Sequence, residues 1–204
     1  MDAEQRCEAL ITEALMFAPE NPEALQTLAS VRLSQDKLQD AQSALTRSVG
    51  LWKDLDPEDD MVPDFPTRVS LARLLMEAEL EDDAMEVLER LALEDDQSVE
   101  ACYLGGWCLH LLADKLKKSQ EGTKEEGDDE ATDMLKLSRR WLLNTLRLYD
   151  LQDYEDDRLK DHTTELVNGL NDVLGPVPEG AEAEEEEEEW LDDGDEEDEE
   201  MAGT

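Results

Sequence analysis

Basic residues are scarce in this chain of 204 residues, in which 18 Lys and Arg stand against 57 Asp and Glu and the formal net charge is −39. Proteins bind DNA and RNA chiefly through Lys and Arg contacts to phosphate, so we expect no direct nucleic-acid binding. An anionic membrane surface repels such a chain for the same reason. A protein this acidic instead attracts basic partners.

Long apolar runs are also missing. No stretch reaches the roughly 18 residues that a membrane-spanning helix needs. The first ten residues, MDAEQRCEAL, lack the basic and then apolar pattern of a signal peptide. These two absences predict a cytoplasmic and nuclear location.

Residues that bind metals or carry out catalysis are few. The three cysteines, Cys7, Cys102 and Cys108, are odd in number and match no zinc spacing, which is typical of free structural thiols. The two histidines, His110 and His162, are far apart in sequence. The sequence contains no Gly-rich phosphate loop, no Gly-x-Ser-x-Gly and no His-Glu-x-x-His. We therefore expect a protein that is not an enzyme, has no cofactor or metal, and acts by binding another protein.

Helical periodicity dominates the rest of the sequence. It predicts an all-α fold of the tetratricopeptide-repeat type, a right-handed superhelix (α-solenoid) with a disordered acidic C-terminal tail. The best repeat match begins at Pro22, with a large residue, a Leu-small pair and a small residue in the second helix at Leu25, Leu28, Ala29 and Ala41. The preceding segment, Ala3 to Phe17, matches only the second helix of a repeat, so the first repeat is expected to be incomplete. Its apolar stripe, Cys7, Ile11 and Leu15, then has no first helix of the same repeat as a partner helix. Either the natural N-terminus is longer, or the stripe pairs with another copy of the chain or with the client.

The composition divides the chain into two parts. Residues 1–178 are assigned to the repeat domain, and residues 179–204, with 16 acidic and no basic residues, to the disordered tail. Within the domain, residues 115–133 are polar and lack periodicity, which predicts a disordered insertion. A helix over about residues 153–174 is expected to cap the stack. Thr67 is expected to N-cap the helix that follows the long connection from Trp52 to Pro66.

The concave face of such a stack is lined by the first helix of each repeat. Residues Glu100, Tyr103, Trp107 and His110 recur at helical spacing on one such face, and Glu77 lies on the preceding one. We expect these five residues to bind the partner, with Tyr103 and Trp107 as aromatic anchors and the carboxylates facing basic side chains. Ordinary packing between repeats is the alternative role for the two aromatic residues. The same reasoning places Val69, Arg73, Met76, Glu23, Gln26, Ser30 and Leu33 on this face.

A family resemblance rests on four features of the sequence. They are the segment Glu-Ala-Cys-Tyr-Leu-Gly-Gly-Trp-Cys from Glu100, the later Trp141-Leu142-Leu143, the closing His162-Thr163-Thr164-Glu165-Leu166 and the acidic tail. Together they resemble the fungal assembly chaperones of ribosomal protein four of the large subunit, over most of the chain after Pro19. The resemblance implies a tetratricopeptide superhelix that binds the long basic internal loop of its newly made client and carries it to the nucleus.

Charge and resemblance together favour a dedicated chaperone that binds and escorts a newly made basic ribosomal protein of the large subunit, using its concave groove and acidic surface. Two other functions stay open. A general tetratricopeptide adaptor or co-chaperone would clamp a C-terminal carboxylate, but among the expected groove positions only Arg73 is basic. A histone escort would share the acidic tail.

Overall fold

The computed structural model describes residues 3–119 and 127–176, which form helices and no strands. The expected tail, residues 179–204, lies outside the described residues. The helices within these ranges are α1 (Ala3–Phe17), α2 (Pro22–Ser34), α3 (Leu38–Gly50), α4 (Phe65–Glu77), α5 (Glu81–Glu94), α6 (Val99–Ser119), α7 (Gly127–Leu151) and α8 (Asp157–Leu174).

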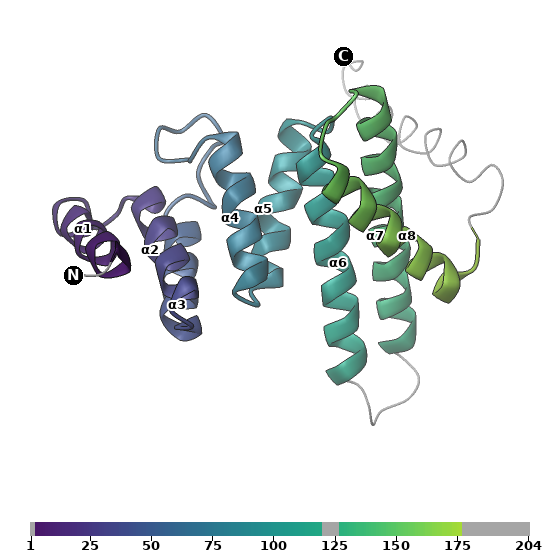
Figure 1. Cartoon of the computed structure of the whole chain (residues 1–204), viewed down its shortest axis with the longest axis horizontal. Helices are drawn as coiled ribbons and strands as arrows, with labels where there is room; N and C mark the ends of the chain where they lie inside the picture. Colours follow the sequence, from purple (N-terminus) through teal and green to yellow (C-terminus); the bar gives the residue numbers. More distant parts are fainter. Residues whose placement is uncertain (1–2, 120–126, 177–204) are drawn as a thin grey trace, which may run out of the picture.

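Consecutive helices pack as pairs, and the pairs stack side by side along the molecule (Figure 1). The pairs are α2 with α3, α4 with α5, and α6 with α7, while α1 packs against α2 and α8 against α7. This arrangement is the α-solenoid of the tetratricopeptide type that the sequence predicts. The expected all-α fold class is confirmed.

The repeat positions that begin at Pro22 form the core of the first complete pair. Leu25, Ala29 and Ala41 are at most 2% exposed. Asn21 caps α2, because its side chain accepts a hydrogen bond of 2.8 Å from the Ala24 backbone N–H, and Pro22 occupies the first turn. The sequence pattern therefore places both the start of this helix and its buried face.

Arg90 of α5 fastens the long connection between α3 and α4. Its guanidinium lies 5.3 Å from the ring centroid of Trp52, a side chain that is only 1% exposed. The same guanidinium donates to the backbone oxygens of Trp52 at 3.4 Å and Leu55 at 3.0 Å, and also to that of Lys53. One side chain thus satisfies three carbonyls of a segment that has no helix of its own.

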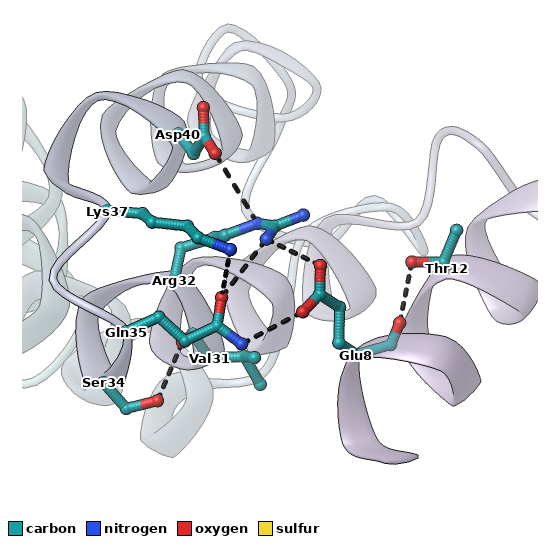
Figure 2. A network of polar contacts seen from close by, with 8 residues as sticks. All are labelled: Glu8, Thr12, Val31, Arg32, Ser34, Gln35, Lys37 and Asp40. Carbon is teal, nitrogen blue, oxygen red and sulfur yellow. Dashed lines mark hydrogen bonds and ion pairs between the residues drawn. The ribbon is translucent and has the colours of Figure 1, made fainter. Parts of the chain in front are cut away.

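Polar contacts attach α1 to the rest of the stack, as Figure 2 shows. Glu8 forms an ion pair of 2.7 Å with Arg32 and accepts a hydrogen bond of 3.0 Å from Gln35. These contacts, that with Gln35 foremost, lower the pKa of the Glu8 carboxyl below its usual value. Ile11 and Leu15 of the expected apolar stripe are half-buried and α1 packs against α2, so the expectation that the stripe has no partner helix is wrong. Other apolar residues of this helix stay open, since Leu10, Met16 and Phe17 are 66%, 80% and 84% exposed. Self-association through this helix stays a prediction.

The prediction of a disordered insertion over residues 115–133 is wrong at both ends, because helices extend into this range from each side. Helix α6 continues to Ser119 and α7 begins at Gly127, while residues 120–126 lie outside the described residues. Two buried alanines, Ala113 and Ala131, and the 2% exposed Leu135 continue the contact between the two helices. Lys115 also binds the Glu79 backbone oxygen at 3.2 Å and the Glu81 carboxylate. The sequence prediction missed this contact because the few apolar residues that form it lie among many polar ones.

Two further boundaries can be compared with the sequence predictions. Helix α4 begins at Phe65 and its cap is Asp64, not Thr67, because the Thr67 N–H donates to the Asp64 carboxylate at 2.9 Å. Pro66 fits the first turn of this helix, where a backbone N–H is not needed. The closing helix α8, Asp157–Leu174, lies inside the range of about 153–174.

Gly106 sets the close approach of α6 and α7. A Cβ atom at this residue would lie 2.6 Å from Cγ of Leu142, which is fully buried, and 3.1 Å from the Ser138 backbone oxygen. The Ser138 hydroxyl in turn donates to the Gly106 oxygen at 2.7 Å. Because neither neighbour has room to move, the absence of a side chain is required here.

We predict that Gly106→Ala lowers the free energy of unfolding by about 1–3 kcal/mol, the usual cost of overpacking a core. Gly169→Ala is the matched control, because a Cβ atom there meets nothing within 4 Å in the middle of α8. That change should raise the stability by about 0.5–1 kcal/mol through helix propensity. Urea denaturation followed by circular dichroism measures both, and equal effects of the two changes would contradict the packing argument.

Candidate protein-binding pocket

A hollow of about 500 Å³ lies over α6, with residues of α4 and of the start of α8 as its walls. This volume is within the range of ligand sites in proteins and exceeds that of a single side chain. The floor is apolar, and charged groups stand around it. The lining residues are Arg73, Met76 and Glu77 from α4, Tyr103, Leu104, Trp107 and Leu111 from α6, and Asp156, Arg158 and Leu159 at the start of α8.

Helix α8 reaches onto α6 through His162. Nδ1 of His162 lies 2.7 Å from the Tyr103 hydroxyl oxygen, and the His162 ring meets the Trp107 ring edge-on at a centroid distance of 5.0 Å. Burial raises the pKa of the Tyr103 phenol, so the hydroxyl stays neutral in this contact. Tyr103 and Trp107 therefore line the pocket and also support the junction between α6 and α8.

Most of the charges around the pocket already have partners. Arg73 forms an ion pair of 3.0 Å with Glu100, which also accepts a hydrogen bond of 3.3 Å from Tyr154. The Asp156 carboxylate caps α8 by accepting from the backbone N–H groups of Arg158 and Leu159, both at 3.1 Å. These contacts hold the two acidic groups in place and leave them less able to bind a partner.

The structure brings together three of the five expected partner-binding residues, since Glu77, Tyr103 and Trp107 all line the pocket. Glu100 lies beside it, engaged with Arg73. His110 is not among the lining residues, and its Nε2 lies 3.9 Å from the Asp114 carboxylate. The expected groove is thus narrower than helical spacing alone suggests.

Two residues expected on the concave face are instead buried between repeats. Val69 is 4% exposed and Gln26 is 9% exposed. The Gln26 side-chain amide donates to the Thr67 backbone oxygen at 3.2 Å, which links α2 to α4. The prediction for these positions is wrong because Gln26 packs against α4 and Val69 belongs to the main hydrophobic core.

Sequence reasoning missed the wall formed by Asp156, Arg158 and Leu159. These residues lie about fifty positions beyond Trp107 in the sequence, and only the packing of α8 brings them to the pocket. The available signal was His162, a half-buried polar ring that needs a partner on another helix.

Metal-binding groups, membrane-spanning helices and reactive thiols can each be assessed for the described residues. Within residues 3–119 and 127–176, no group of three or more His, Cys, Asp or Glu is placed to hold a metal ion. No helix in these ranges has the length and apolar character to cross a membrane. Burial raises the pKa of the Cys102 thiol to about 11 and that of Cys108 to about 12, which keeps both protonated near neutral pH.

Comparison with known proteins gives two curated relatives, and no family model matches. A probable assembly chaperone of rpl4 from Emericella nidulans is 58% identical over 177 residues, which are 85% of this chain and 46% of the relative. A probable assembly chaperone of rpl4 from Schizosaccharomyces pombe is 34% identical over 176 residues, 86% of this chain and 51% of the relative. The resemblance expected from the sequence is confirmed. The chain spans about half the length of the curated relatives that it matches.

A solved structure agrees with the sequence comparison. The assembly chaperone of RpL4 (Acl4, residues 1–338) is 58% identical, with a TM-score of 0.57, over 58% of this chain and 42% of that one. Identity at this level together with the shared helical stack means that the described helices follow the same fold as these chaperones.

We predict that a maleimide reagent at about pH 8 labels Cys7 and spares Cys102 and Cys108, because the thiolate is the reactive form. Cys7 is exposed, whereas the other two are buried and have raised pKa values. Peptide mass spectrometry before and after addition of urea measures the pattern. Labelling of Cys108 in the folded protein at the rate of Cys7 would contradict the burial of that helix face.

Proposed function

We propose that this chain acts as a dedicated chaperone that binds newly made rpl4, a basic ribosomal protein of the large subunit, and escorts it for ribosome assembly. The observation that carries the proposal is the 58% identity to a probable assembly chaperone of rpl4 over 85% of the chain. The role is binding and not catalysis. A binding role is consistent with the pocket over α6, which has an apolar floor.

Charge supports a basic client. A ribosomal protein carries Lys and Arg for rRNA, and these side chains bind any RNA that they meet before assembly. A chain with 57 acidic residues competes for the same side chains without being a nucleic acid. We propose that the acidic surface shields the client while the pocket holds one segment of it.

The site of action follows from the same proposal. A chaperone that accompanies a ribosomal protein from its synthesis to its assembly works in both the cytoplasm and the nucleus. Direct contact with nucleic acid is not part of the proposed role, since the pocket offers only two basic side chains, Arg73 and Arg158.

The alternative of a co-chaperone that clamps a C-terminal carboxylate has weaker support. Such a clamp needs several free cationic or amide groups that converge on one carboxylate. Arg73 is engaged with Glu100 at 3.0 Å, which leaves Arg158 as the available guanidinium in the pocket.

We predict that Leu111→Glu weakens rpl4 binding by about ten- to a hundredfold, mainly through faster dissociation. Leu111 is a half-buried pocket residue, and a carboxylate there removes apolar contact. The matched control is Leu93→Glu on α5, where the leucine is 90% exposed and does not line the pocket. Surface plasmon resonance with purified rpl4 measures both rates.

Both substitutions add the same negative charge, so a purely electrostatic attraction to a basic client predicts equal or tighter binding in both. Equal affinities of the two variants would therefore rule out the pocket as the client site. Urea denaturation of each variant confirms that the helical stack is intact. Failure of the unaltered chain to bind rpl4 at all would reject the proposed function.

We predict that deletion of residues 179–204 slows association with rpl4 and flattens its dependence on salt, while dissociation stays nearly unchanged. This segment carries 16 acidic and no basic residues, so it adds long-range attraction that salt screens. Association and dissociation rates at two salt concentrations test this. A large rise in the dissociation rate would show instead that the tail holds the client.

A further inference from the structure

Two charged side chains at the pocket have no partner among the described residues. Glu77 lies in the last turn of α4, and Arg158 lies in the first turn of α8. Both residues are exposed, and both line the hollow. Since the two helices provide different walls, one unpaired carboxylate and one unpaired guanidinium border the same apolar floor.

The charge of the pocket differs from that of the chain. Over the whole sequence, 57 acidic residues stand against 18 Lys and Arg. The pocket lining, in contrast, contains two acidic residues, Glu77 and Asp156, and two basic ones, Arg73 and Arg158. A site that worked only by attracting positive charge would not place two guanidinium groups in its walls. The pocket lining therefore does not share the acidic excess of the whole chain.

Of the four charged residues that line the pocket, two already have partners within the protein. Arg73 is neutralised by Glu100 at 3.0 Å, and the Asp156 carboxylate is used by the backbone of α8 at 3.1 Å. This leaves Glu77 to meet a cation and Arg158 to meet an anion. Charged groups at the edge of an interface set register and specificity more than they add affinity.

The floor between them favours an apolar group. Leu104 is 1% exposed and Met76 is 7% exposed, and Trp107 and Leu111 are half-buried. Aromatic and aliphatic floors of this kind bind large apolar side chains, which dominate the energy of most protein interfaces. The unoccupied volume of about 500 Å³ accommodates such a side chain together with the backbone that carries it.

We propose that the pocket binds a bipolar segment of the client, in which a large apolar side chain lies on the floor, a Lys or Arg meets Glu77 and an Asp or Glu meets Arg158. The inference rests on the proposed function and makes it more specific. An acidic residue in an otherwise basic client then fixes the direction in which the segment lies across α6. A purely basic segment without it fits the pocket poorly.

Arg158→Glu separates this proposal from simple charge attraction. The change makes the chain more acidic, so attraction to a basic client predicts tighter binding, whereas a bipolar segment predicts weaker binding. The matched control is Lys118→Glu, which makes the same change of charge at an exposed residue of α6 that does not line the pocket and has no partner among the described residues. Binding of purified rpl4 is measured by surface plasmon resonance.

We expect Arg158→Glu to raise the Kd for rpl4 by about fivefold or more, within the range of charge pairs at interfaces, while Lys118→Glu leaves it unchanged or lowers it. The double variant Glu77→Lys with Arg158→Glu keeps the net charge of the chain and should weaken binding further. Glu89→Lys with Lys118→Glu is its control, because Glu89 is exposed on α5 outside the pocket.

Equal or tighter binding of Arg158→Glu than of Lys118→Glu would overturn the bipolar segment while leaving the proposed function intact. Absence of rpl4 binding by the unaltered chain would overturn both. If Arg158→Glu lowers the urea midpoint, Arg158→Gln replaces it, since this change removes the positive charge, keeps a polar side chain and adds no negative charge. The expected direction is then the same, and unaltered affinity of Arg158→Gln would reject the proposal.

Discussion

The structure depends on the close contact of α6 and α7. Gly105 and Gly106 lie on the face of α6 that meets Trp141 and Leu142. Because they have no side chains, the two helices pack closer together than they could with any larger residue at these positions. This contact fixes α7, and α7 in turn carries most of the packing of α8. The position of α8 then decides which part of α6 is covered by His162 and which part stays open as the pocket.

Charge and shape act over different ranges in this molecule. The excess of acidic residues acts through the solvent, and it weakens within about 8 Å at physiological salt. The pocket acts only on contact, through an apolar floor with balanced charges. Under the proposed function, the acidic excess attracts a basic client and the pocket then selects among basic proteins, because charge alone does not distinguish one from another.

The sequence could predict features that depend on neighbours within one helix pair. The buried face that contains Leu25, Ala29 and Ala41 follows from spacing alone, and so does the placement of Tyr103 and Trp107 on one side of α6. It could not predict Arg158 as a lining residue, since this depends on how a helix far along the chain crosses α6. The contact between α6 and α7 at Ala113 and Ala131 could not be predicted either, because two small apolar residues are a weak signal among many charged ones.

The connection between α3 and α4 illustrates how part of such a chain can change freely. Arg90 recognises the backbone oxygens of Trp52, Lys53 and Leu55, and every amino acid supplies an equivalent oxygen. The identities of residues 53 and 55 are therefore little constrained by this contact, whereas Arg90 and the ring of Trp52 are tightly constrained. The contact with Arg90 therefore permits sequence change at some residues of the connection, provided that Arg90 and Trp52 are both retained.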